Sequence, residues 1–405
     1  MRAEQAAAGP PRNAHALAML LVVVFINIAG FSLILPLLPF YGQAFSASAV
    51  EVTMLFAAYS FGNIFGEIYW GRTSDKVGRK RILAITMACA ALSYVAFAYA
   101  PSLHIALIIR IVSGFFSGTL GVVQSYIADI TPPQERARNM GYFGAAFNLG
   151  FATGPAIGGL LAQPEQGLAG FHLPILAAAC FAGAASIWSL FALRETRQPG
   201  GAARPLPSYD EAFRFVMHNP LLLRLFILAF IAIAAFSSME AVFGLWTEHN
   251  FGWNAREVGL AFVAVGGAGM VVQAVLLGPL VKRFGERRVI VAGIVTLILS
   301  MIFQPLTRDP VAAVMLMSLL MVGHSLTFPN VGALTSRNTP AETQGSVLGA
   351  QMAVNALARI VAPPIFGLLY TVMSPDAPYL ICALMMLIGL LIAVQMMRAH
   401  ARTAS

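Results

Sequence analysis

Runs of about 20 apolar residues recur along the whole chain, and a helix of that length crosses about 30 Å of membrane hydrocarbon. Of 405 residues, 58% are hydrophobic and only 10% are charged, whereas about a quarter of the residues of a soluble domain are charged. The chain therefore has material for roughly a dozen membrane-spanning helices with short connections. This composition excludes a soluble enzyme, a collagen and a disordered protein.

The distribution of basic residues predicts the orientation in the membrane. The sequence predicts twelve spans, of which the first covers residues 17–40 and the last covers residues 377–397. The loops on one side then carry 21 Lys and Arg, and those on the other side carry only Arg256 and Arg308. Cytoplasmic loops carry the excess of basic residues, so both termini are expected in the cytoplasm. The basic residues are dispersed among loops, which argues against a nucleic-acid partner.

The longest polar stretch, residues 194–220, divides the chain into an N-terminal bundle (1–193) and a C-terminal bundle (221–405), each with six spans. Within this linker, Ser208 and Glu211 predict a capping box that opens a short helix. Its apolar stripe is expected to lie on the membrane surface and consists of Ala212, Phe213, Val216 and Met217.

The two halves resemble each other at a nearly fixed offset of 206 to 208 residues. Glu51 recurs as Glu257, and the Pro155-to-Gly159 segment recurs from Pro363 to Gly367. Parallel repeats of this kind predict a pseudo-twofold axis along the membrane normal, with a site between the halves near the midplane.

Between spans two and three the chain reads Gly71-Arg-Thr-Ser-Asp75-Lys76-Val-Gly78-Arg79-Lys80. A tight turn at Gly78 needs permissive backbone angles, and Asp75 is able to meet a helix N-terminus or a neighbouring cation. The alternative interpretation is an ordinary solvated loop on the positive side.

Span five contains small residues that allow two helix backbones to approach closely. They are Gly141, Gly150, Gly154, Pro155, Gly158 and Gly159. Pro155 removes one backbone hydrogen bond and bends the helix. We expect a watertight seam between halves, with a partner surface at Gly266, Gly267 and Gly269 of span eight; ordinary helix packing is the alternative.

The loop motif resembles the signature of the major facilitator superfamily, and the glycine motif resembles that of its proton-coupled drug antiporter branch. Within the first span, the segment from Gly30 to Pro39 is similar to that of tetracycline-resistance exporters and their multidrug relatives. This resemblance implies an all-α membrane protein of the bacterial inner membrane, with twelve helices in two bundles. It also implies that Asp75 docks near Thr343 when the cytoplasmic side is closed, and that Asp129 pairs with Arg79 or its neighbours. Asn27 stands where those exporters carry an acid, which argues against tetracycline as substrate.

Five ionisable side chains lie inside the predicted spans, where each costs about 2.5 to 3.5 kcal/mol. Glu67 is only one turn from the cytoplasmic loop and is read as a gate or a capped structural acid. Arg110 resembles the fourth-span arginine that the family links to proton transfer. Glu240 is the expected proton carrier and His324 the second candidate, because imidazole titrates near physiological pH. A purely structural role is the alternative for each.

The expected substrate cavity is polar and lies between the halves. Its predicted lining residues are Asn27, Asn148, Gln351, Asn355 and Arg359. The expected function is proton-coupled export of lipophilic or amphiphilic small molecules by alternating access; the alternative is proton-coupled uptake of a small metabolite. No phosphate-binding loop or His/Cys cluster occurs in the sequence. We therefore expect no enzyme activity, no metal and no cofactor besides the proton gradient, in a protein that works as a monomer.

Overall fold

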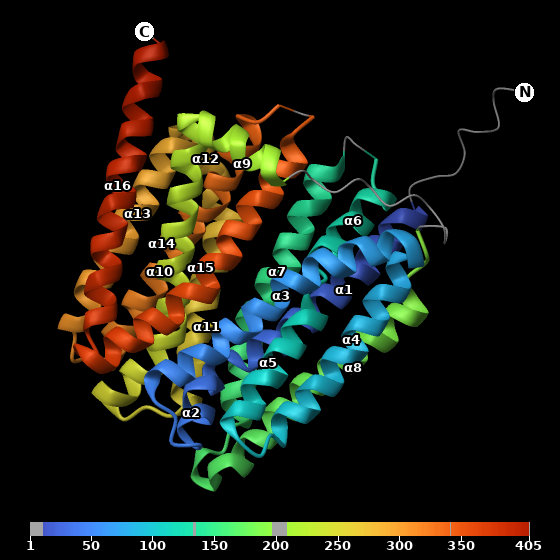
Figure 1. Ribbon diagram of the computed structural model, residues 1–405, viewed down its shortest axis with the longest axis vertical. Coiled ribbons are helices and arrows are strands. Elements are labelled where there is room, and N and C mark those ends of the chain that lie inside the picture. Colours follow the sequence, from blue (N-terminus) through green and yellow to red (C-terminus); the bar gives the residue numbers. More distant parts are fainter. Residues whose placement is uncertain (1–10, 133–134, 197–208, 341, 405) are drawn as a thin grey trace, which may run out of the picture.

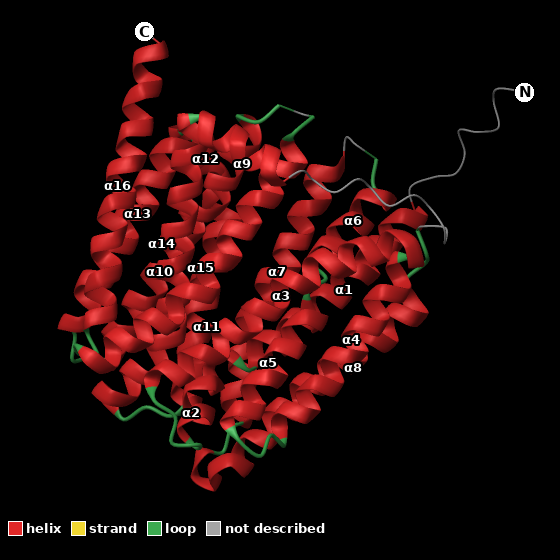
Figure 2. Ribbon diagram, in the orientation of Figure 1, coloured by secondary structure: helices red, strands yellow, loops and turns green. Residues whose placement is uncertain are grey.

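The computed structural model describes residues 11–132, 135–196, 209–340 and 342–404, and all regular elements in these ranges are helical (Figure 2). The N-terminal half comprises α1 (Pro11–Leu33), η1 (Leu35–Leu37), α2 (Leu38–Gln43), α3 (Ala49–Val77), α4 (Arg79–Ala98), α5 (Leu103–Ser117), α6 (Leu120–Ile130), α7 (Arg136–Leu161), η3 (Pro164–Phe171) and α8 (His172–Ala192). The C-terminal half follows with α9 (Tyr209–His218), α10 (Pro220–Phe251), α11 (Ala255–Val271), η4 (Val272–Leu276), α12 (Leu277–Phe284), α13 (Glu286–Phe303), η5 (Gln304–Leu306), α14 (Pro310–Arg337), α15 (Gln344–Val372) and α16 (Ala377–Ala404).

Within the described residues, eleven helical segments are long and apolar enough to cross a membrane, where the sequence predicted twelve. The segment that falls short corresponds to span five, the 26-residue helix α7. Its glycines and polar residues lower its hydropathy. Because α7 packs against α1 and α11, part of its surface meets other helices and needs no apolar side chains.

The helices form two bundles that follow the chain order, blue to green and yellow to red in Figure 1. The start of α1, the end of α16 and the short helix α9 lie at one end of the molecule, here called the terminal end. The opposite end carries α2 and is called the α2 end. The bundles meet through α3 against α15 and through α7 against α11.

The repeat seen in the sequence is also a repeat of local geometry. Ser48 and Glu51 form a capping box at the start of α3, and Asn254 and Glu257 form the same box at the start of α11. At the opposite ends of these two spans, α3 ends before a turn at Gly78, with φ of 110°, and the continuous run of α11, η4 and α12 ends before a turn at Gly285, with φ of 78°. Positive φ angles favour glycine, so the predicted tight turn at Gly78 is confirmed.

The fourth span, expected to be one helix, is broken between α5 and α6. The chain turns at Gly118 and Thr119, and a Cβ atom on Gly118 would collide with the backbone of α3 at Gly66 and Glu67. The break therefore lies where α3 and α5 come into backbone contact. Leu103–Ile130 still forms one segment long and apolar enough to cross the membrane, in agreement with the predicted fourth span. The sequence did not indicate the break, because Gly118 looks like one more small residue in an apolar run.

The linker helix α9 packs on the C-terminal bundle against α10 and α15. Ala212 and Val216 are buried there, whereas Phe213 and Met217 are exposed. The predicted stripe on the membrane surface is thus divided: half of it belongs to the protein core. Ser208, the predicted cap, lies outside the described residues. Asn219 caps the next helix, α10, by accepting hydrogen bonds from the backbone N–H groups of Leu221 and Leu222.

Candidate functional site

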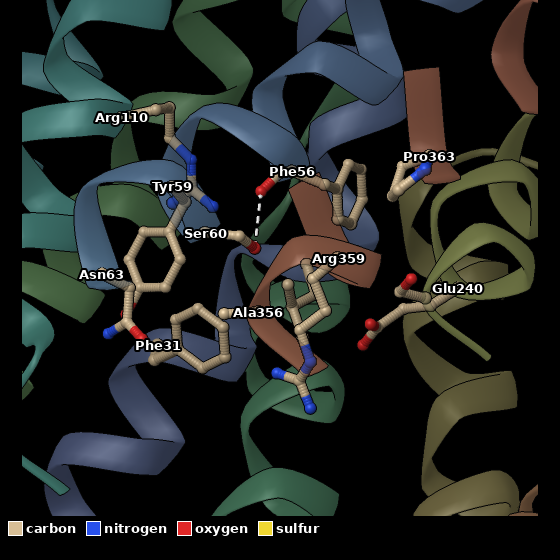
Figure 3. A pocket seen from close by; sticks show the side chains of 12 residues that line it. Phe31, Phe56, Tyr59, Ser60, Asn63, Arg110, Glu240, Ala356, Arg359 and Pro363 are labelled. Atoms are coloured by element: carbon tan, nitrogen blue, oxygen red, sulfur yellow. Dashed lines mark hydrogen bonds between the residues drawn. The ribbon is translucent and has the colours of Figure 1, made fainter. Parts of the chain in front are cut away.

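A cavity lies between the two bundles and takes its lining from both of them (Figure 3). The N-terminal half contributes α1, η1, α3 and α5, and the C-terminal half contributes α10 and α15. The lining residues are Phe31, Leu35, Phe56, Tyr59, Ser60, Asn63, Arg110, Ser237, Glu240, Ala356, Arg359 and Pro363. The cavity thus brings together three of the ionisable residues that the sequence singled out.

Glu240 on α10 and Arg359 on α15 line this cavity from the C-terminal half, and Figure 3 shows the Glu240 carboxylate directed toward the Arg359 side chain. They are not an ion pair, since no N–O distance of 4.0 Å or less joins them among the described residues. One carboxylate oxygen of Glu240 is buried without a hydrogen-bond partner. Arg359 is exposed, on the same helix face as the lining residues Ala356 and Pro363. Both charges are therefore presented to the cavity.

Arg110 on α5 enters the cavity wall from the N-terminal half and is only 1% exposed. Its Nε donates a hydrogen bond of 3.2 Å to the carbonyl oxygen of Leu55, and its guanidinium carbon lies 4.5 Å from the centroid of the Tyr59 ring. A cation over a desolvated aromatic face gains about 2 kcal/mol. Nη1 is buried without a partner, so Arg110 combines a backbone contact with a free donor.

His324 on α14 does not line the cavity. Its ring stacks on Phe236 of α10, with centroids 4.0 Å apart, and on Phe328, at 5.5 Å. Its Nδ1 is buried without a partner. Two predicted cavity residues on α15 are likewise absent from the cavity lining: Gln351 is 5% exposed, and the Asn355 side-chain oxygen is buried without a partner. These polar groups lie within the C-terminal bundle.

Of the other predicted cavity residues, neither Asn27 nor Asn148 appears among the lining residues. Asn148 on α7 instead bridges the two halves: its Nδ2 donates a hydrogen bond of 2.5 Å to Oε1 of Gln273. Gln273 lies in η4, a π-helical segment that interrupts the eighth span. π-segments inside α-helices occur frequently at functional sites.

The signature loop at the terminal end is organised around Arg79, which is 1% exposed. Its guanidinium lies 2.5 Å from the carboxylate of Asp129 and 3.4 Å from that of Asp75. Its backbone N–H donates to Glu195 at 2.8 Å. In this conformation Asp75 and Asp129 share one buried cation inside the N-terminal bundle. At Gly71, the first residue of the motif, an added Cβ atom would meet no neighbour within 4 Å.

Glu67 on α3 meets the break in the fourth span. Its carboxylate accepts a hydrogen bond of 3.2 Å from the backbone N–H of Gly121, in the first turn of α6. A carboxylate at a helix N-terminus satisfies free N–H groups and interacts favourably with the helix dipole. Of the two interpretations of Glu67, this geometry supports the structural acid, which caps the N-terminus of α6.

The glycines of α7 serve two contacts. Gly150, Gly154 and Gly158 lie against the backbone of α1, within the N-terminal bundle. Gly159 lies against Gly259 of α11, in the other bundle. Pro155 lies inside the helix between these positions, and Gly141 has no neighbour within 4 Å. The motif therefore builds one seam inside a bundle and one seam between bundles.

The partner surface on α11 differs from the predicted one. Gly266 packs against Ala152 of α7, but Gly267 has no neighbour within 4 Å, and Gly269 faces Met321 of α14. The sequence did not single out Gly259, which makes the closest contact. The repeat could have indicated it. Gly259 stands 206 residues after Thr53, so the two residues occupy equivalent positions in the two halves. Thr53 contacts Gly367, just as Gly259 contacts Gly159.

The halves are also joined at the α2 end by polar groups that the sequence did not indicate. The Gln43 amide on α2 donates a hydrogen bond to the carboxylate of Glu248 on α10. Pro39 lies against Gly244 of the same helix. The sequence also did not single out the cavity residues Ser60, Asn63 and Ser237, whose only signal is that they are polar side chains on membrane-spanning helices.

A polar cavity shared by two bundles of apolar helices defines a membrane transporter rather than an enzyme. The chain belongs to the Major Facilitator Superfamily, whose family model matches residues 20–275 and 225–404.

The relatives of this chain include resistance proteins. It is 29% identical to the class C tetracycline resistance protein of Escherichia coli, covering 89% of this chain and 90% of that one. It is 31% identical to the class G protein of Vibrio anguillarum (87% and 89%) and 26% identical to multidrug resistance protein 2 of Bacillus subtilis (92% of each). Among solved structures, the fold is similar to the human organic anion transporter MFSD10 (TM-score 0.70, 20% identity, covering 95% and 100%). It is also similar to the nucleoside transporter NupG (TM-score 0.77, 15% identity, covering 94% and 99%).

Proposed function

We propose that this chain is a proton-coupled secondary transporter that exports lipophilic or amphiphilic small molecules by alternating access. The observation that carries the proposal is the cavity between the bundles, which is lined by Glu240 of the C-terminal half and by aromatic side chains of the N-terminal half. The similarity to tetracycline and multidrug resistance proteins supports the export direction.

In this proposal α7 is the twelfth span, and the terminal end faces the cytoplasm of a bacterial cell, across its inner membrane. The excess of Lys and Arg in the loops of the terminal end supports this orientation. The contacts of Gly159 with Gly259 and of Gln43 with Glu248 then close the extracellular side. The cavity would exchange with the cytoplasm in this state and with the outside after the bundles rock.

Glu240 is the proposed proton carrier. A carboxylate in the cavity binds either a proton or a cationic group of the substrate, and this competition couples export to proton entry. One proton crossing at 100 mV supplies about 2.3 kcal/mol. We propose that Arg110 and Arg359 adjust the charge around Glu240, that His324 is a secondary proton site, and that the protein works as a monomer without another cofactor.

The test uses purified protein in liposomes with an imposed pH gradient, screened against dyes, antibiotics and small metabolites for substrate-induced proton movement. Export coupled to protons requires substrate and protons to move in opposite directions. Glu240→Gln should abolish the coupled proton flux, whereas Glu165→Gln, at an exposed position of η3, should leave it unchanged. Proton and substrate movement in the same direction would instead establish the uptake symporter.

A further inference from the structure

The cavity presents charges of both signs that remain unpaired. Glu240 and Arg359 face each other without an ion pair, and one oxygen of Glu240 is buried without a hydrogen-bond partner. No hydrogen bond among the described residues involves the Arg359 guanidinium. Burial of the Glu240 oxygen is costly unless it is paired, whereas the Arg359 guanidinium is exposed to the cavity. A ligand that brings one positive and one negative group would satisfy both.

A third charged side chain, that of Arg110, determines the net charge of the cavity lining. Arg110 contributes a second guanidinium, whose Nη1 is buried without a partner. Two guanidinium groups and one carboxylate leave the lining net positive when all are ionised. A ligand with only a cationic group would gain from Glu240 and be opposed by both arginines, so an anionic group is required as well.

Aromatic side chains of the N-terminal half form an apolar wall of the cavity, against which the apolar part of a ligand can pack. Phe31 stacks on Tyr59 with ring centroids 4.8 Å apart, and both line the cavity from the N-terminal half. The charged pair lies across from them on α10 and α15 (Figure 3). An aromatic or aliphatic body against α1 and α3 thus places its polar groups toward the C-terminal half.

We infer that the cavity selects amphiphilic zwitterions, in which a protonated amine meets Glu240 and a carboxylate or similar anion meets Arg359. This inference rests on the proposed function and names the substrate class of the same site. Arg359 is then the residue that determines specificity for the anionic group. Because a proton on Glu240 expels the amine, zwitterion binding is compatible with proton exchange.

Four matched fluorescent probes test the inference. Nε-dansyl-lysine is a zwitterion, its Nα-acetyl derivative is an anion, its methyl ester is a cation, and the compound with both modifications is neutral. Binding to the purified transporter and flux into proteoliposomes should favour the zwitterion over the ester and the neutral compound by about tenfold, the value of one charge-assisted hydrogen bond.

Arg359→Gln should remove the preference for the zwitterion over its methyl ester, and Arg359→Lys should restore part of it. Arg256→Gln, at an exposed position near the α2 end, should leave the preference intact. Preference for the cationic or neutral probe, failure of all four to bind, or an unchanged preference in Arg359→Gln would each overturn the inference. Proton exchange driven by a purely cationic or neutral compound would show that the proposed function stands while this inference fails.

Discussion

Gly159 on α7 lies so close to Gly259 on α11 that a Cβ atom on Gly159 would come 2.8 Å from the Gly259 Cα. On the pseudo-symmetric side, Gly367 on α15 is similarly close to Thr53 on α3. Both contacts lie at the α2 end, where α7 and α15 end and α3 and α11 begin. The two bundles therefore approach closely at this end, through a backbone contact at Gly159 and through the Thr53 side chain and the Ala49 carbonyl at Gly367.

Gly159→Val should prevent this closure. Overpacking of a tight contact costs about 1–3 kcal/mol, which lowers the closed population by about 5- to 150-fold. We expect reduced transport and faster labelling of a cysteine introduced at the cavity residue Ser237 by a reagent added from the α2 end. Gly141→Val is the matched control, because nothing lies within 4 Å of that position. Equal labelling rates in the two variants would contradict the role of this contact.

Arg79→Ala should destabilise the N-terminal bundle strongly. Arg79 is 1% exposed and contacts the carboxylates of Asp75 and Asp129, and breaking a buried ion pair costs about 3–5 kcal/mol. Thermal unfolding of the detergent-solubilised protein measures the loss. Arg81→Ala, at an exposed position in the first turn of α4, should have little effect. Adding Asp129→Asn to Arg79→Ala should recover stability, and strict additivity of the two changes would argue against the pairing.

Glu67→Ala should loosen the start of α6. Loss of an N-terminal cap costs about 0.5–2 kcal/mol, and the carboxylate of Glu67 is bound to the Gly121 N–H. Glu67→Gln keeps an acceptor oxygen and should recover most of the loss in apparent melting temperature. Glu165→Ala serves as the control for removing an acid. Equal melting temperatures for Glu67→Ala and the native protein would exclude the capping role.

The sequence predicts the transporter fold because its main signals are local or repeated. Apolar runs predict the helices, and the glycine at position 78 permits the positive φ angle that the turn adopts. The offset of 206 residues carries the capping box at Ser48 to a second box at Asn254. These features need no knowledge of tertiary contacts.

The site is less predictable, because the direction of a side chain depends on how the helices pack. Glu240, Arg110 and Arg359 stand out by charge alone and do line the cavity. His324 stands out equally, yet its ring is stacked against two phenylalanines inside one bundle. Gln43 lies in a polar segment after the first span, where nothing in the sequence distinguishes it as a partner of a residue 205 positions away.

The hydrogen bond from Gln43 to Glu248 should hold the α2 end closed. It joins α2 of one bundle to α10 of the other, and a hydrogen bond to a charged group contributes about 1.5–3 kcal/mol. Gln43→Ala and Glu248→Ala should therefore each favour opening of this end by about tenfold or more. Spin labels at Ala44 and His249, both exposed, report the distance between the bundles in a background without the native cysteines.

Each single variant should increase the population with a long distance between the labels, and the double variant should add little, because the two residues share one bond. Gln166→Ala removes a hydrogen bond to Gln163 within η3 and should leave the distance distribution unchanged. If the effects of Gln43→Ala and Glu248→Ala were fully additive, the two side chains would act independently, and the contact would have no part in holding the bundles together.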